Sequence, residues 1–182
     1  MFYGSSYDRG LDILLGLYPQ VIHKFPDTTL HIAYGWNLYD VAFNNNPERM
    51  AWKEKINNLM KQKGITHHGR ISKEELKKVR LQCGIWAYPT YFTEINCITA
   101  LECQRDGVVP CTMNFGALTE TVQSGIKVDG DISDQETKDK WLNSLFTLMS
   151  DEKLWKDNQA EGNKFANRFT WDRIAHLWIS AF

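Results

Sequence analysis

Short apolar runs alternate along the chain with segments whose apolar residues recur at helical spacing. The first helical segment spans residues 10–25, where apolar residues form a stripe along one side of a helix. Pro19 lies inside this stripe and predicts a kink or a break. Further helices are expected at residues 51–63, 72–79, 96–106 and 115–124, with two more after Asp134. The polar run NNNPERM, residues 44–50, predicts a loop.

The apolar runs between these helices predict strands. They occupy residues 1–4, 29–35, 64–70, 84–89, 108–113 and 125–130. Ser72 and Glu75 stand at capping-box spacing, which predicts a helix start between two of the strands. The strand–helix alternation indicates an α/β fold, a doubly wound, Rossmann-like parallel sheet of about six strands with helices on both faces.

A chain of 182 residues suits one domain, so residues 1–182 are expected to form a single unit. Ligands of doubly wound sheets bind outside the carboxyl ends of the strands. In this sequence those ends fall at residues 5–9, 35–36, 69–70, 89–94 and 113–116. Functional residues are therefore expected in these segments.

Charge and hydropathy exclude several classes of partner. The net charge of −1 provides no basic footprint, so no nucleic-acid partner is expected. No apolar run reaches membrane-spanning length, and the opening MFYGSSYDRG does not have a signal-peptide pattern. The adjacent His67 and His68 have no acidic or cysteine partner at ligand spacing, so no metal site is predicted.

The four cysteines show no C-x-x-C spacing; they are Cys83, Cys97, Cys103 and Cys111. We interpret them as reduced thiols, which favours a cytoplasmic protein. Cys97 stands near an expected helix start, where a thiolate is favoured, so it could act as a nucleophile. We favour a buried, backbone-lining role for it.

The stretch TEINCITALECQ, residues 93–104, contains two glutamates, Glu94 and Glu102. Glu94 follows a strand, and the helix expected after it has its N-terminus at the ligand-binding edge, where free N–H groups attract anions. Eight helical residues span about 12 Å. Each carboxylate could therefore meet one hydroxyl-rich end of a ligand whose anionic part lies between them. A nucleotide sugar has this shape.

The longer stretch YPTYFTEINCITALECQRDGVVPCTMNFGALTETV, with its E-x7-E spacing, resembles the signature of retaining GT-B glycosyltransferases of the family 4 type. The opening SSYDRGLDILL is similar to the start of the first helix in that family, and GALTE to its later glycine loop. The motifs occur in the family's order over nearly the whole chain. They belong to the C-terminal, donor-binding half of a GT-B enzyme.

The resemblance implies roles for several residues in donor binding. Glu94 would accept hydrogen bonds from the donor sugar, and Glu102 would bind the ribose hydroxyls. Arg9 would neutralise the diphosphate and stabilise the leaving group, which makes Glu94 and Arg9 the catalytic candidates. The other nucleotide-sugar-binding candidates are Ser5, Ser6, Gly69 and Arg70, together with the backbone amides of Asn96, Cys97, Ile98 and Thr99.

Two departures from the family pattern concern this site. Ser5 or Ser6 replaces a second basic residue of the first loop, and both serines could instead be turn or cap residues. Ile95, Asn96 and Cys97 replace the family's small and aromatic residues, which affects the preferred sugar. The resemblance implies neither a metal nor another cofactor, since the nucleotide sugar is the donor substrate.

The resemblance also implies an absent N-terminal, acceptor-binding GT-B domain as partner. We expect the chain, an excised domain or a natural half, to bind a nucleotide sugar without transferring it. Peripheral membrane association of the intact enzyme stays open. Alternatives are a related epimerase or phosphorylase, and a non-catalytic nucleotide-sugar sensor of the same fold. A dinucleotide-binding redox domain is excluded because no G-x-G-x-x-G follows the first strand.

Overall fold

The computed structural model describes residues 1–181. Within that range the chain forms one sheet of six parallel strands in the order β3-β2-β1-β4-β5-β6. The strands are β1 (Phe2–Tyr3), β2 (Leu30–Ala33), β3 (Ile65–Gly69), β4 (Ile85–Tyr88), β5 (Val109–Met113) and β6 (Ile126–Val128). Each lies within a predicted apolar run, and the doubly wound class is confirmed.

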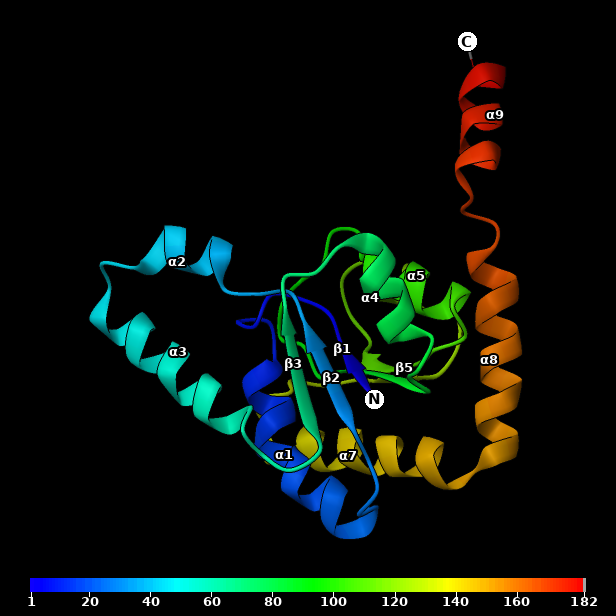
Figure 1. Ribbon diagram of the computed structural model, residues 1–182. Helices are drawn as coiled ribbons and strands as arrows, with labels where there is room; N and C mark the ends of the chain where they lie inside the picture. Colours follow the sequence, from blue (N-terminus) through cyan, green and yellow to red (C-terminus); the bar gives the residue numbers. More distant parts are fainter. Residues whose placement is uncertain (182) are drawn as a thin grey trace.

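Helices cover both faces of this sheet (Figure 1). They are α1 (Leu11–Lys24), α2 (Asn37–Phe43), α3 (Pro47–Leu59), α4 (Lys73–Arg80), α5 (Ile98–Arg105), α6 (Leu118–Thr121), α7 (Gln135–Ser150), α8 (Glu152–Ala166) and α9 (Trp171–Ala181). Helices α1 and α7 lie on one face, and α4 and α5 lie on the other (Figure 1).

The strand order reverses direction beside β1. The chain runs outward from β1 through β2 to β3 and then returns to place β4 on the other side of β1. In doubly wound sheets a crevice opens at such a switch point, outside the carboxyl ends of the strands. The loops that follow β1 and β4 therefore flank the expected ligand position.

The central strands β1, β4 and β5 are buried on both faces, which explains why they read as continuous apolar runs. All four residues of β4 are buried, and Trp86 stacks on Tyr88 with ring centroids 4.9 Å apart. Trp141 of α7 is fully buried in the same core. The four cysteines are unpaired and buried, in agreement with their interpretation as reduced thiols.

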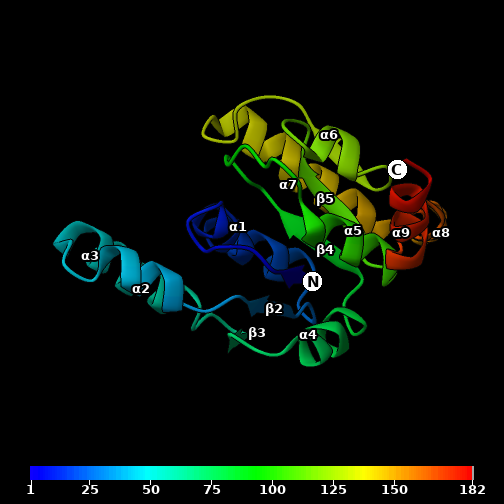
Figure 2. The same ribbon diagram turned by 90° about the horizontal axis from the view of Figure 1, so that it is seen from above.

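The region between β2 and β3 differs from the expected loop and single helix. Helix α2 occupies residues 37–43, and α3 already begins at Pro47, inside the run predicted to be a loop. The Asn46 side chain accepts a hydrogen bond from the Arg49 backbone N–H, so Asn46 caps a helix whose first residue is a proline. The polar run of residues 44–50 therefore contains the start of a helix and is not a loop throughout. The two helices project from the body of the molecule (Figures 1 and 2).

Four other helical predictions need correction. Helix α1 passes through Pro19 without a break. Helix α5 begins at Ile98 rather than at residue 96, and α6 is shorter than residues 115–124. Within residues 1–181, three helices follow Asp134 instead of two. The chain leaves helical geometry between α8 and α9, where the Thr170 side chain accepts a hydrogen bond from the Arg173 N–H. No residue of α9 is buried, and it extends beyond α8 (Figure 1).

Alanine substitutions at Gly10, which precedes α1, and at Gly16, inside α1, test whether the residue before this helix must be a glycine. Gly10 has φ +104°, and a Cβ there would lie 2.2 Å from the Pro89 carbonyl oxygen, whereas a Cβ at Gly16 would meet nothing within 4 Å. We expect Gly10→Ala to lower the free energy of unfolding by about 2 kcal/mol or more. Gly16→Ala should raise it by about 0.5–1 kcal/mol. Urea unfolding measures both changes in free energy. Equal effects of the two substitutions would contradict the close approach of Gly10 to the Pro89 carbonyl oxygen.

Candidate functional site

A buried carboxylate lies at the switch point of the sheet. Glu94, in the loop after β4, is 7% exposed and pairs with Arg9 of the loop after β1, with 3.3 Å between Arg9 Nη1 and Glu94 Oε1. The Tyr88 hydroxyl donates to the same oxygen at 2.6 Å. Ser5 Oγ lies 3.1 Å from that hydroxyl and must donate to it, since the Tyr88 proton is already used. The Arg9 guanidinium also lies 3.7 Å from the centre of the Phe92 ring.

These contacts compensate Glu94 for the loss of water. Charge-assisted hydrogen bonds to a carboxylate are the strong kind, and a buried carboxylate without partners is costly. Burial, followed by the bond to Glu94, raises the pKa of Tyr88 well above its ordinary value. Tyr88 therefore remains a hydrogen-bond donor at neutral pH.

Two further loops hold the segment around Glu94. The Ala117 N–H donates to the Glu94 carbonyl oxygen at 2.8 Å. Gly116 has φ +57°, and a Cβ on it would lie 2.9 Å from the same oxygen. Gly10 makes the corresponding close approach to Pro89 on the other side. The loops after β1, β4 and β5 thus meet at Glu94, and glycines permit two of the contacts.

The N-terminus of α5 lies directly after this carboxylate. Cys97 is its N-cap residue and makes no side-chain capping bond, while the Ala100 N–H donates to the Cys97 carbonyl oxygen at 3.1 Å. The positive end of the α5 dipole favours an anion at this terminus. Asn96 and Ile98 are exposed, and Cys97 is buried. Thr99 Oγ1 donates to the Gly4 carbonyl oxygen at 3.2 Å, which ties this first turn to β1.

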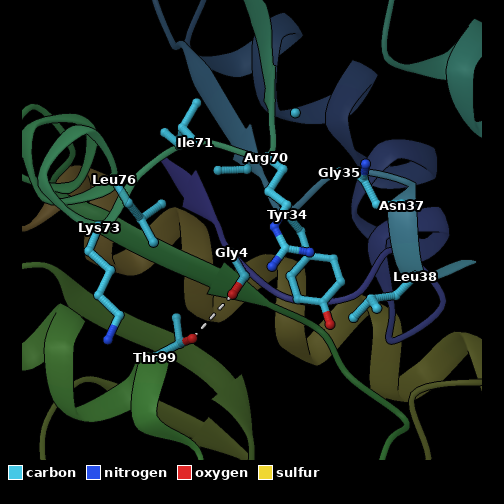
Figure 3. Close-up of a pocket in the computed structure, with 12 residues that line it drawn as sticks. Gly4, Tyr34, Gly35, Asn37, Leu38, Arg70, Ile71, Lys73, Leu76 and Thr99 are labelled. Atoms are coloured by element: carbon cyan, nitrogen blue, oxygen red, sulfur yellow. Dashed lines mark hydrogen bonds between the residues drawn. The ribbon is translucent and has the colours of Figure 1, made fainter.

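A pocket of about 400 Å³ opens beside this helix start, at the carboxyl ends of β1, β2 and β3 (Figure 3). It contains three of the predicted site residues, Gly69, Arg70 and Thr99. None of the remaining lining residues was named as a site candidate, although Gly35 lies in a strand-end segment where functional residues were expected. They are Gly4, Ala33, Tyr34, Gly35, Asn37, Leu38, Ile71, Lys73 and Leu76. Strand-end position was the signal for Gly35; the α2 and α4 residues had none, because only folding brings these helices to the pocket.

Gly35 brings the ends of β2 and β3 together at the pocket. It has φ +89°, and a Cβ on it would lie 2.9 Å from the Arg70 backbone nitrogen. The Gly35 N–H donates to the Tyr7 hydroxyl at 2.9 Å. Tyr7 in turn contacts His67 through its hydroxyl, with 2.7 Å to Nε2. The pocket wall is therefore connected to the loop after β1.

Glu102 lies outside the pocket lining and contacts an arginine of α4. Its Oε2 is 2.9 Å from Arg80 Nη1, and Arg80 Nε is 2.8 Å from Asp106 Oδ2. The Arg80 side chain is 3% exposed, while that of Glu102 is 31% exposed. Thr99 of the pocket is one helical turn before Glu102 on α5, so the carboxylate follows the pocket on the same side of the helix.

The other sequence candidates are placed as follows. Ser6 Oγ donates to Asp8 Oδ1 at 2.6 Å, which fits the turn role that was its alternative. His68 stacks on His31 with 3.0 Å between ring nitrogens. Within residues 1–181 no group of three or more metal-ligating side chains is assembled. No helix in the described part of the chain is long and apolar enough to cross a membrane.

The fold and the site together define a Rossmann-like domain with an ion-paired carboxylate, a helix N-terminus and a pocket at one switch point. Its family is shown by the sequence. The chain belongs to the family described as glycosyl transferases group 1, whose model matches residues 5–165. None of the curated proteins matches the chain.

Solved structures of glycosyltransferases share this fold. The pneumococcal O-GlcNAc transferase GtfA, in complex with UDP and GlcNAc, superposes with a TM-score of 0.74 at 17% identity, over 99% of this chain and 34% of that one. Sucrose-phosphate synthase from Thermosynechococcus elongatus has a TM-score of 0.72 at 16% identity, over 100% and 45%. A glycosyltransferase from Rickettsia africae ESF-5 has a TM-score of 0.71 at 18% sequence identity, over 99% of this chain and 46% of that one. The chain thus spans less than half of each neighbour.

The thiol of Cys97 provides a direct test of the site's burial. Burial raises its pKa to about 12, so it is a neutral thiol at physiological pH and a poor nucleophile. We expect native protein at pH 8 to react with a thiol-specific reagent at less than about one hundredth of the rate seen in urea, because all four cysteines are buried. A rapidly labelled thiol assigned to Cys97 by mass spectrometry would restore the nucleophile interpretation.

The histidines of β2 and β3 predict acid sensitivity. Burial lowers the pKa of His31 and of His67 below the ordinary 6.5. The unfolded chain therefore binds more protons than the folded one, and stability is lost as pH falls through about 6.5. We expect the drop in unfolding free energy between pH 7 and pH 5 to shrink in His31→Gln/His67→Gln and to persist in His176→Gln, on exposed α9. Equal drops in unfolding free energy in the wild type and in both variants would contradict the lowered pKa values of His31 and His67.

Proposed function

We propose that the chain is the donor-binding domain of a retaining, metal-independent GT-B glycosyltransferase of the family 4 type. The observation that carries this proposal is the ion pair of Arg9 with the buried Glu94, beside the N-terminus of α5 and a pocket at the switch point of the sheet. Membership in glycosyl transferases group 1 supports it. A nucleotide sugar needs three adjoining subsites, for a nucleoside, a diphosphate and a sugar, and we assign these to the pocket, the start of α5 and Glu94.

The nucleoside would occupy the pocket. Its walls combine apolar side chains with the ring of Tyr34, which suits a base, and Gly69 and Arg70 lie at the entrance loop. Glu102 keeps a partly exposed carboxylate one helical turn beyond Thr99, where it can accept hydrogen bonds from ribose hydroxyls. Its pairing with Arg80 orients the carboxylate in advance.

The diphosphate would lie at the start of α5, and the sugar at Glu94. The backbone amides of Asn96, Cys97, Ile98 and Thr99 would donate to phosphate and sugar oxygens there. Arg9 supplies positive charge from the opposite loop, with Ser5 nearby. Glu94 uses one oxygen for Tyr88 and retains acceptor capacity for a sugar hydroxyl.

The transfer step needs no covalent enzyme intermediate. The bond between the anomeric carbon and the diphosphate oxygen breaks, and the bonding electron pair leaves with the nucleoside diphosphate. The acceptor hydroxyl forms its bond on the same face, and its proton passes to the departing diphosphate oxygen. Positive charge around the diphosphate stabilises this transition state because negative charge develops there.

Transfer would require the acceptor-binding half. The chain spans 34% to 46% of three solved neighbours, and one of them, GtfA, is also known in a GtfA/B complex. Trp171 and Ile179 of α9 are 89% and 74% exposed, which provides apolar surface for a second domain. We propose an N-terminal GT-B domain as that partner, in a protein of the cytoplasm, where the unpaired cysteines would stay reduced.

Calorimetric titration with UDP, GDP, ADP and their common sugar conjugates tests the proposal. We expect saturable binding of one nucleotide and of its conjugate, without sugar transfer by this chain. Glu102→Ala should weaken both by about tenfold or more, because a charged hydrogen bond to ribose is lost. Glu94→Gln should remove only the additional affinity of the conjugate, and Glu161→Ala, exposed on α8, should change neither.

Thermal unfolding of each variant serves as the folding control for this titration. Wild-type protein that binds none of these ligands, or equal losses in Glu102→Ala and Glu161→Ala, would contradict the donor-site assignment. Efficient sugar transfer by the chain alone would contradict the assignment of this domain as a half that needs its partner.

A further inference from the structure

Two histidines from neighbouring strands meet outside the lining of the pocket. His31 of β2 and His68 of β3 are 37 positions apart in the sequence, yet only 3.0 Å separates His31 Nδ1 from His68 Nε2. Both side chains are half-buried, and neither lines the pocket. The pair joins the two outermost strands on one side of the sheet, where β2 and β3 lie side by side (Figure 1).

A β-bulge directs His68 toward His31. His68 has no partner in the register with β2, because its neighbours His67 and Gly69 pair with consecutive residues of that strand. A bulge re-aims a side chain, and bulges are over-represented next to functional sites. The preceding His67 contacts the Tyr7 hydroxyl through its Nε2 instead. The irregular backbone at His68 is thus the feature that brings two imidazoles together.

The separation of the two nitrogens suits a shared metal ion. Two imidazole nitrogens that bind one ion at about 2.0–2.1 Å, at a right or tetrahedral angle, lie about 2.9–3.4 Å apart. The observed 3.0 Å falls in this range. Imidazole is a ligand for Zn²⁺, Ni²⁺ and Cu²⁺, whereas Mg²⁺ and Ca²⁺ take oxygen ligands. The geometry therefore favours the first group of ions.

Both rings can supply a nitrogen to an ion without losing a proton. In the hydrogen bond between them one ring donates its N–H and the other accepts. On metal binding the donating ring would carry this proton on its other nitrogen, and each ring would turn about its Cβ–Cγ bond to direct a lone pair at the ion. Burial lowers the pKa of His31 below its ordinary 6.5, which keeps that ring neutral at pH 7.

We propose that His31 and His68 form a two-histidine site for a divalent transition-metal ion, Zn²⁺, Ni²⁺ or Cu²⁺, that links β2 to β3. Within residues 1–181 no third ligating side chain joins the pair, so water completes the coordination. The affinity is accordingly lower than that of structural zinc sites with four protein ligands. The site is separate from the proposed glycosyltransferase function: the ion stabilises the outer strands and takes no part in sugar transfer.

The test is titration of the chain with NiCl₂ or ZnCl₂ in a buffer that does not chelate metals, followed by calorimetry and by thermal unfolding. We expect saturable binding of one ion below about 1 mM. Excess ion should raise the unfolding temperature by at least about 4 °C, because it binds the folded chain preferentially. MgCl₂ should do neither, since Mg²⁺ takes oxygen ligands.

Single substitutions assign the site. His31→Gln and His68→Gln should each weaken binding by about tenfold or more and remove the rise in unfolding temperature, because one of two protein ligands is lost. His23→Gln on α1 and His176→Gln on α9 replace exposed histidines and should bind like wild type. Thermal unfolding without metal shows whether each variant is folded.

A measurement on the wild type needs no variant. Substoichiometric Cu²⁺, which is paramagnetic, should broaden the imidazole NMR signals of His31 and His68 before those of His23 and His176. Wild type that binds neither Ni²⁺ nor Zn²⁺ below about 1 mM would overturn the proposal. Equal weakening of binding in His68→Gln and His176→Gln, or broadening that begins at His23 or His176, would also overturn it.

Discussion

The burial of one carboxylate, that of Glu94, governs the ligand edge of this sheet. A charge that is 7% exposed is stable only if its neighbours replace the lost water, and Arg9 and Tyr88 do so from two strand ends that are adjacent only in the fold. The loop after β5 adds a backbone bond to the same segment. The loops after β1, β4 and β5 are therefore held in one arrangement, and this arrangement fixes where α5 begins.

Charge is distributed unevenly around this centre. Arg9 and Arg80 are both paired with carboxylates, those of Glu94 and Glu102. Arg70 and Lys73 instead line an open pocket without acidic neighbours in its lining. The edge of the sheet thus combines carboxylates held by arginines with two cations at an open pocket.

Two parts of the molecule lie outside the doubly wound core. The α2–α3 pair is attached through an aromatic cluster in which Trp36 contacts Tyr39 and Trp52, and α2 contributes to the rim of the pocket. Helix α9 buries no residue. The chain spans less than half of the length of its structural neighbours.

The sequence by itself determined the elements and their class, because hydrophobic period, capping and turn chemistry act within a few residues. The six strands, the capping box at Ser72 and the position of Glu94 after β4 were all readable in this way. One local feature was missed. Asn46 and Pro47 mark the start of α3, but an asparagine-rich polar run resembles a loop until its capping hydrogen bond is seen.

Only the tertiary structure decided which residues meet. Arg9 and Glu94 are 85 positions apart, and the strand order alone places their loops side by side. The pairing of Glu102 with Arg80, and the contributions of Tyr34 and Lys73 to the pocket, depend on how helices pack across the sheet. No local pattern encodes such contacts, because they arise from the burial of distant segments against one another.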